Sequence, residues 1–262
     1  MWIRVSTSLF IYTIMKKIIL LAFISLYQFT FSQTNNKLHV TYVFYNKNTN
    51  ENADIELYID KAHAFSEFIN KNGKEKDSIF ETETDLKISL KNNDTVGKQY
   101  YVTKDSILFR DHLFLDNKFT PVIVSENMPK YKWNLLDETL NIGDLLCQKA
   151  ILKFRGRNFT VWYTEEIPTP FGPWKFYGLP GLIVRIITDD ESIAFNLNTI
   201  ESISEVKIHK PTLGKRINFK EYVELTENAL SEFVNRMQTK MPVNTSITIN
   251  KVNLNGIEKN FK

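Results

Sequence analysis

Short runs in which apolar and polar residues alternate recur along most of this chain, and they constrain the fold more than any other feature. Ala53 to Ile59 places apolar residues at every second position, and Cys147 to Phe154 repeats the alternation. A period of two places successive side chains on opposite faces of a β-strand. Runs that recur every 8–12 residues or so, with turn residues between them, favour an antiparallel sheet over alternating strands and helices.

The runs interpreted as strands are 38–45, 53–59, 62–69, 99–103, 106–110, 119–125, 131–136, 147–154, 159–163, 182–188, 193–200 and 245–254. Residues 78–90 are ambiguous, with a strand favoured at their end. We predict a turn from Thr139 to Gly143 and a hairpin connection from Arg155 to Asn158.

One stretch near the carboxyl end has a helical period instead. Asn218 suits an N-cap, Glu221 follows three residues later, and apolar residues then recur at helical spacing until Pro242. We therefore predict a mainly β fold with one helix (α+β). An antiparallel meander forms an open or partial barrel or sandwich, and the helix, at about 218–238, docks on the sheet. A helix that binds a partner is the alternative.

The amino terminus has the pattern of an export signal. Lys16 and Lys17 precede an apolar run of about ten residues, and Ser32 provides a small residue at the end of the following polar stretch. The run is shorter than the roughly 20 residues that a membrane helix needs. We predict a signal peptide at 1–32, with the true start at Met15, and a single β-rich domain at 33–262. A longer amino-terminal region and a buried helix are the alternatives.

The charge of the chain argues against a nucleic-acid partner, and its cysteine content argues against an internal disulfide. Residues 1–32 hold three bases and no acid, so their removal leaves 30 basic and 30 acidic residues. A chain with zero net charge lacks the electrostatic basis for binding nucleic acid, and no nucleic-acid partner is predicted. Cys147 is the single cysteine, so an exported chain has no internal disulfide and depends on packing for stability.

The stretch from Trp162 to Ile187 differs from the rest of the chain. It holds four of the eight prolines, three of the nine glycines and two of the four tryptophans. Proline fixes φ and glycine frees it, so a segment this rich in both is held in one irregular shape. We interpret it as a rigid connection between strands that covers an open barrel end. An aromatic-lined mouth for an apolar or peptidic ligand is the functional alternative.

Within this stretch lies a structural motif and, before it, the candidate ligand-binding residues. Proline followed by glycine in the motif predicts a type II turn with positive φ at Gly181, from which a buried strand begins. Gly178 indicates either a close backbone approach or another positive φ. The motif is Gly178, Leu179, Pro180, Gly181, Leu182 and Ile183, and the candidate binding residues are Trp162, Tyr163, Glu165, Trp174, Lys175 and Tyr177.

No residue pattern identifies a catalytic site, a metal site or a cofactor site. Cys147 would need a nearby histidine and acid to act as a nucleophile, and a lone cysteine in a strand usually behaves as a small buried hydrophobe. The histidines lack zinc-type spacing, and no phosphate loop, dinucleotide fingerprint or G-x-S-x-G is present. Adjacent Glu165 and Glu166 point to opposite faces of a strand and cannot act as a pair. The histidines are His39, His63, His112 and His209.

The segment IPTPFGPWKFYGLPGLI (Ile167–Ile183) resembles the signature of the GLPGLI family of exported proteins from Bacteroidota. The similarity extends to Tyr131-Lys132-Trp133, to Cys147-Gln148-Lys149-Ala150 and to Trp162–Pro168. The resemblance implies export and a β-rich fold. The family has no established activity, and its genes are often found near outer-membrane transporters and envelope peptidases. It supplies no catalytic residues to carry over.

Taken together, the residues and the resemblance predict an exported protein of the periplasm or outer membrane. A non-enzymatic binding or accessory protein is the leading hypothesis. Its expected partners are an apolar or peptide ligand, or an outer-membrane transporter or other envelope protein. The alternative is an envelope hydrolase, peptidase-like, that uses Cys147 or convergent acidic residues.

Overall fold

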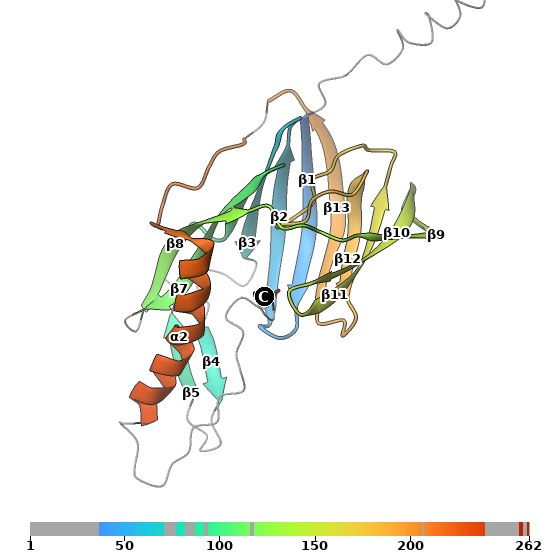
Figure 1. Cartoon of the computed structure of the whole chain (residues 1–262). Coiled ribbons are helices and arrows are strands. Elements are labelled where there is room, and N and C mark those ends of the chain that lie inside the picture. The colour runs from blue at the N-terminus through green and yellow to red at the C-terminus, as the bar shows by residue number, and fades with distance from the viewer. Residues whose placement is uncertain are drawn as a thin grey trace, which may run out of the picture. The chain divides into compact units, whose positions relative to one another are not determined.

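Twelve strands form one open sheet in the order β14-β8-β7-β6-β3-β2-β1-β13-β12-β11-β10-β9 (Figure 1). The structure is a computed structural model that describes residues 37–70, 77–81, 87–91, 94–115, 118–205, 207–238, 257–258 and 261. These residues belong to one compact unit, Lys37–Lys262. The predicted signal peptide and the predicted strand at 245–254 lie outside the described residues.

The first strands are β1 (Lys37–Asn46), β2 (Glu51–Ile59), β3 (His63–Asn70), β6 (Gln99–Thr103), β7 (Ser106–Leu115) and β8 (Lys118–Asn127). The later strands are β9 (Asn134–Ile142), β10 (Leu145–Phe154), β11 (Arg157–Thr164), β12 (Leu182–Thr188), β13 (Ile193–Ile203) and β14 (Lys215–Asn218). A separate two-stranded sheet pairs β4 (Asp77–Glu81) with β5 (Lys87–Lys91), within the ambiguous region. The helix is α2 (Phe219–Gln238).

The predicted fold class, mainly β with one helix and an open sheet, is confirmed. Two antiparallel runs of strands, β1 to β8 and β9 to β13, meet where β1 pairs with β13. β14 is the exception, because it pairs with β8 in parallel. The chain therefore leaves β8 near one edge of the sheet and begins β9 at the opposite edge. Residues 128–133, the crossover segment, make that passage (Figure 1).

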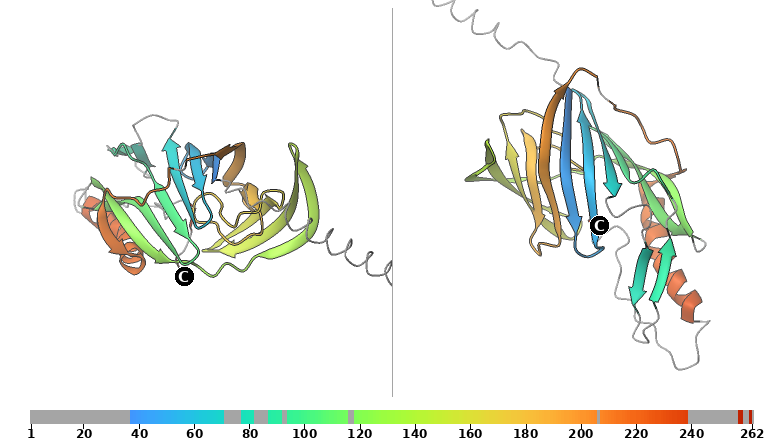
Figure 2. Two further views of the ribbon diagram at one scale, coloured as in Figure 1. Left: turned by 90° about the horizontal axis from the view of Figure 1, so that it is seen from above. Right: turned by 180° about the vertical axis from the view of Figure 1, so that it is seen from behind.

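Alternation of side chains gives the sheet a buried inner face and a more exposed outer face. In β1, Val40, Tyr42 and Phe44 are buried, and the residues between them are less so. Figure 2 shows the sheet curving around the segments that cover its inner face. The hydroxyl of Tyr42 donates a hydrogen bond of 2.7 Å to the carbonyl of Ile183, which joins β1 to the start of β12.

The helix docks as the sequence predicts, with its boundary set by its N-cap. The backbone N–H of Glu221 donates to Oδ1 of Asn218 at 2.9 Å, which satisfies one of the free N–H groups at the start of α2. The helix packs on β7, β8 and β14. Tyr222 anchors it, because its ring meets Phe109 edge-on and its hydroxyl donates to Asp111 at 2.8 Å.

The predicted turn from Thr139 to Gly143 is wrong. Residues 139–142 belong to β9, where Thr139 pairs with Gln148 and Leu140 with Cys147. The turn comes later, at Gly143 and Asp144, and Gly143 has φ of 59°. A two-residue hairpin turn needs positive φ, which glycine adopts without strain, so a single well-placed glycine allows the strand to run longer than the polar residues indicated. The strand predicted at 131–136 likewise begins only at Asn134.

Candidate functional site

The connection between β11 and β12, residues 165–181, folds into a narrow loop on the inner face. The N–H of Gly172 donates to the carbonyl of Phe176 at 2.9 Å, and the N–H of Gly178 donates to the carbonyl of Pro170 at 2.8 Å. Trp174 lies at the tip with φ of 60°, an uncommon conformation for a bulky residue. The loop is thus fixed by backbone hydrogen bonds, and it is packed within the core rather than over an open end.

The hexapeptide 178–183 owes its glycines to two different constraints. Gly178 has φ of 100°, as its position in the sequence indicated. Gly181 is not among the residues with positive φ, so the predicted type II turn is wrong. A Cβ at Gly181 would instead lie 2.0 Å from the carbonyl oxygen of Thr164, a backbone atom that cannot move aside. Close approach of the end of β11 is therefore the reason for glycine at this position.

The six candidate binding residues do not share one surface. Trp174, Lys175 and Tyr163 are buried, at 0%, 1% and 1% relative exposure. Trp162 and Tyr177 are half-buried, and Glu165 is exposed. An aromatic mouth formed by all six is therefore not what the structure shows.

Two of the buried members of the set are held by hydrogen bonds, Tyr163 through its hydroxyl and Lys175 through its backbone carbonyl. The hydroxyl of Tyr163 donates to Gln148 at 2.7 Å, and burial raises the pKa of Tyr163. Tyr131 and Trp133 of the crossover segment donate to the backbone carbonyls of Lys175 and Tyr177, at 2.7 and 3.0 Å. These bonds hold the loop against the crossover segment.

Lys175 belongs to a buried group of four charges, the ion quartet: Glu126, Arg155, Lys175 and Glu258. The ammonium of Lys175 lies 3.0 Å from Oε2 of Glu126 and 3.2 Å from Oε1 of Glu258. The guanidinium of Arg155 pairs with the same two carboxylates. The side chains are at most 9% exposed. Two cations and two anions alternate, so each charge has opposite charges as its nearest neighbours.

Aromatic rings enclose the quartet. The ammonium of Lys175 lies 4.0 Å from the centroid of Phe109, and the guanidinium carbon of Arg155 lies 4.3 Å from that of Phe219. Burial lowers the pKa of Arg155, but the charges of Glu258 and Glu126 outweigh this effect and raise it. Burial, followed by the same two carboxylates, raises the pKa of Tyr131. The quartet therefore links four segments of the chain inside the core.

Sequence reasoning singled out Lys175 but not its three partners. Glu126 is in β8, Arg155 is in the turn after β10, and Glu258 is near the carboxyl end, so no local spacing joins them. The one available signal is a lysine between two aromatic residues, Trp174 and Phe176, in an otherwise apolar loop.

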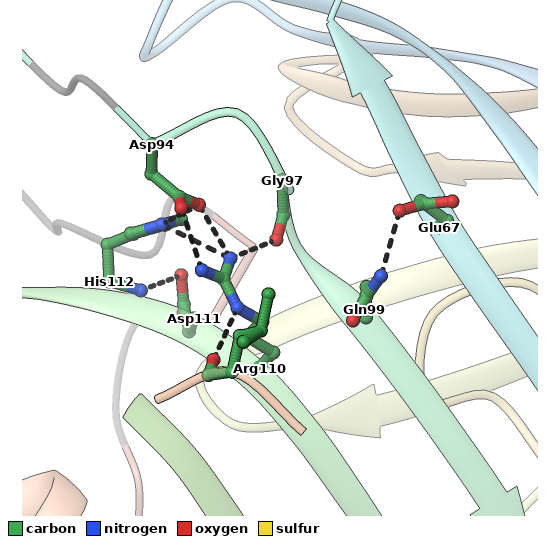
Figure 3. Close-up of polar contacts among 8 residues, drawn as sticks. Glu67, Asp94, Gly97, Gln99, Arg110, Asp111 and His112 are labelled. Carbon is green, nitrogen blue, oxygen red and sulfur yellow. Dashed lines mark hydrogen bonds and ion pairs between the residues drawn. The ribbon is translucent and has the colours of Figure 1, made fainter. Parts of the chain in front are cut away.

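A second polar cluster lies on the outer face at β7 (Figure 3). The guanidinium of Arg110 forms two bonds to the carboxylate of Asp94, at 2.6 and 2.8 Å, and donates to the carbonyls of Gly97 and Leu213. Nε2 of His112 lies 2.6 Å from the same carboxylate. Burial favours a raised pKa for Asp94, but the bonds from Arg110 and His112 prevail and lower it. This cluster fastens the chain around residues 94–97 and 213 to the sheet.

Cys147 does not have the surroundings of a reactive thiol. The side chain is buried, its Sγ lies 3.6 Å from the carbonyl of Leu145, and burial raises the pKa of the thiol. A raised pKa reduces the thiolate that a nucleophile requires. Within the described ranges, no group of three or more His, Cys, Asp or Glu residues is placed to hold a metal ion. No described helix has the length and apolarity to cross a membrane.

Of the two half-buried aromatic members of the candidate set, Trp162 has the larger ring, and it lies on the outer face. Across the sheet it lies beside Lys149 of β10 and Arg185 of β12, and Lys149 is next to Leu136 of β9. The ammonium of Lys149 is 5.9 Å from the Trp162 ring. We call Leu136, Lys149, Trp162 and Arg185 the Trp162 row. It combines apolar surface with two cations on a face that solvent reaches, and it is the candidate binding surface.

Comparison with known proteins places the chain near proteins of unknown function. A family described as "Protein of unknown function (Porph_ging)" matches residues 154–185, which include both cations of the ion quartet and the hexapeptide. No curated protein matches the chain.

Two solved structures of similar fold are described as "Structure of PNGF-II", in the P21 and C2 space groups. They have TM-scores of 0.48, are 14% and 15% identical in sequence, and cover 74% of this chain. The similarity covers 34% and 33% of their own chains, so this chain spans about a third of their length.

Proposed function

We propose that this chain is an exported cell-envelope protein that binds a ligand or partner without catalysing a reaction. Its place is the periplasm or the outer membrane, and its ligand is an apolar or peptidic segment, either free or part of an outer-membrane complex such as a transporter. The predicted signal peptide and the resemblance to GLPGLI proteins support export.

The observation that carries the binding role is the position of Trp162. A half-buried tryptophan flanked by Lys149 and Arg185 offers an apolar face with cations beside it. Tryptophan and arginine are enriched at binding surfaces: tryptophan gives a large contact area for few rotatable bonds, and arginine presents a planar cation with several hydrogen-bond donors. Acidic or carboxyl groups on a peptide would meet the two cations while its apolar side chains cover the ring.

The hydrolase alternative receives less support from the geometry. Cys147 is buried with a raised pKa, and the two acids that contact Lys175 of the loop, Glu126 and Glu258, are held by Arg155 and Lys175. A general acid or base must reach a substrate, whereas these carboxylates are fully engaged inside the core.

Tryptophan fluorescence tests the binding role. The purified chain is titrated with a short peptide of alternating leucine and glutamate, and emission is compared between wild type and Trp162→Phe. We expect a spectral shift in wild type that Trp162→Phe removes, because Trp174 is buried and the indole N–H of Trp133 is held by the carbonyl of Tyr177. A matched peptide with lysine in place of glutamate should bind more weakly. An equal response from both proteins, or none from wild type, would contradict the proposed site.

A further inference from the structure

The two edges of the twelve-stranded sheet are built differently. At one edge, β14 has four residues, includes Lys215 and Arg216, and leads directly into α2, which packs on it. Short strands, basic side chains and a covering helix are devices that keep an edge from pairing with another chain. At the other edge, β9 has nine residues and contains neither lysine, arginine nor proline. The protections of the second edge are a bulge, where the register shifts between Gln148 and Lys149, and the acidic side chains of Asp137 and Glu138.

The free side of β9 is exposed and partly apolar. Seven of its nine residues are exposed, and the other two are half-buried. Leu135 and Leu140 of β9 and Leu146 of β10 are 52%, 44% and 55% exposed, which makes them half of the six large hydrophobic residues that are exposed within the described ranges. Within those same ranges β9 has a strand neighbour, β10, on one side only. Its outward N–H and C=O groups thus form a template for another strand.

The charge of this edge restricts what can pair with it. From Asn134 to Asp144 the chain has three acids and no base. Glu138 is paired with Lys149 at 2.9 Å, whereas Asp137 and Asp144 make no ion pair with any described residue. A strand that brings lysine or arginine beside apolar residues would meet both the acids and the leucines, and cross-strand pairs of opposite charge are favourable.

A second copy of this chain fits the edge poorly. If two β9 strands paired antiparallel over their full length, the centre would fall at Glu138, so Glu138 of one copy would face Glu138 of the other. Like charges directly opposite each other destabilise a strand pair. The edge thus favours a different, basic polypeptide over self-association.

We infer that β9 receives an additional strand: an extended segment of a partner protein in which lysine or arginine alternates with apolar residues. The backbone of the partner would continue the sheet beyond β9. Leu135 pairs with Ala150 and Leu140 with Cys147, so the two leucines lie on opposite faces of the sheet. Apolar side chains of the added strand would contact one leucine, and the aliphatic stems of its basic side chains would contact the other. The inference rests on the proposed binding role, but it uses the sheet edge and not the ring of Trp162.

The experiment uses a nine-residue peptide, equal to β9 in length, in which valine alternates with lysine or threonine. A control peptide has glutamate at each lysine. Affinity is measured by fluorescence anisotropy of the labelled peptides, and the contact is located by amide hydrogen exchange of the purified chain. Protein variants are Asp137→Lys at the edge and Glu232→Lys, a matched charge reversal on the exposed side of α2.

In a Trp162→Phe background, which removes the binding of acidic peptides at the Trp162 row, we expect the basic peptide to bind roughly tenfold more tightly than the acidic one, and to slow exchange at residues 134–142. Asp137→Lys should remove most of that preference, and Glu232→Lys should leave it unchanged. Because the Trp162→Phe background lacks the indole ring, failure at the edge is separable from failure of the Trp162 row. Equal binding of both peptides, protection at another element, or a concentration-dependent dimer that Asp137→Lys abolishes would each overturn the inference.

Discussion

Lys175 and Glu258 are 83 residues apart in the chain, yet their charged atoms lie 3.2 Å apart in the core. The pair joins the 165–181 loop to the carboxyl end, and Arg155 and Glu126 are the other two members of the ion quartet. A buried pair of this kind contributes little net stability over an apolar substitute, but it is costly to leave half-made.

Lys175→Met should therefore destabilise the protein strongly. It leaves Glu126 and Glu258 with Arg155 as the remaining cation of the quartet, and an uncompensated buried carboxylate costs about 3–5 kcal/mol in free energy of unfolding. Urea unfolding followed by circular dichroism measures the change. Lys220→Met is the control, since this side chain is 87% exposed and should change stability by less than about 0.5 kcal/mol. Similar urea midpoints for Lys175→Met and Lys220→Met would contradict this structural role of the ion quartet.

The variants Gly181→Ala and Gly143→Ala distinguish two reasons for a glycine, which are close backbone approach at Gly181 and positive φ at Gly143. At Gly143 a Cβ meets nothing within 4 Å, but φ is 59°, so alanine should cost about 1–2 kcal/mol from backbone strain alone. At Gly181 a Cβ would overlap the Thr164 carbonyl, so the cost should exceed about 3 kcal/mol or prevent folding. Thermal unfolding of both variants provides the comparison. The explanation fails if Gly143→Ala is the more damaging of the two.

Asp94 should make stability depend on acid pH. Its pKa is raised by burial but lowered further by the bonds from Arg110 and His112, so the folded pKa lies below the unfolded value of about 3.9. The stabilisation is therefore fully present above about pH 4 and is lost as pH falls through the folded pKa. Asp94→Asn should be less stable than wild type at pH 7, and the difference should shrink towards pH 3. Asp144→Asn, at an exposed turn, should track wild type throughout. A gap between wild type and Asp94→Asn that is independent of pH would rule out this linkage.

Cys147 should be protected from thiol reagents in the native state. Burial both blocks access and raises the pKa of the thiol, so iodoacetamide should label the folded chain negligibly and the urea-unfolded chain fully. Mass spectrometry gives the extent of labelling, and the single cysteine removes any background. Rapid labelling under native conditions would revive the hydrolase alternative. Unaltered ligand binding by Cys147→Ser would argue further against it.

Local patterns in the sequence predicted most of the strands and the helix, but they predicted the tertiary contacts between distant segments less well. Alternation at 53–59 and the N-cap at Asn218 each depend on neighbouring residues, so the strand and the helix could be located without a structure. The end of β9 was missed because its residues are polar at an exposed edge, where burial does not enforce alternation. The close approach at Gly181 was missed because Thr164 lies outside the motif and its position depends on tertiary structure.

In the candidate site, too, the local features could be predicted and the tertiary contacts could not. Proline and aromatic density marked residues 162–177 correctly as a region held in one shape, but an aromatic residue can be held by a core as well as by a ligand. Trp174 became part of the core, whereas Trp162 stayed at the surface, and their sequence contexts did not distinguish them. Partners such as Glu258 come from so far along the chain that composition gives no sign of them.

The pairing of β1 with β13 has a consequence for the time course of folding. Lys37 pairs with Ile203, and the ion quartet is incomplete until residue 258 has been made. Forming contacts this distant in sequence costs loop-closure entropy before any contact energy is gained. Folding therefore takes about milliseconds to seconds. A growing chain thus cannot complete its core until residue 258 has been made. If the chain is exported as we propose, such a delay would help it to cross a membrane unfolded.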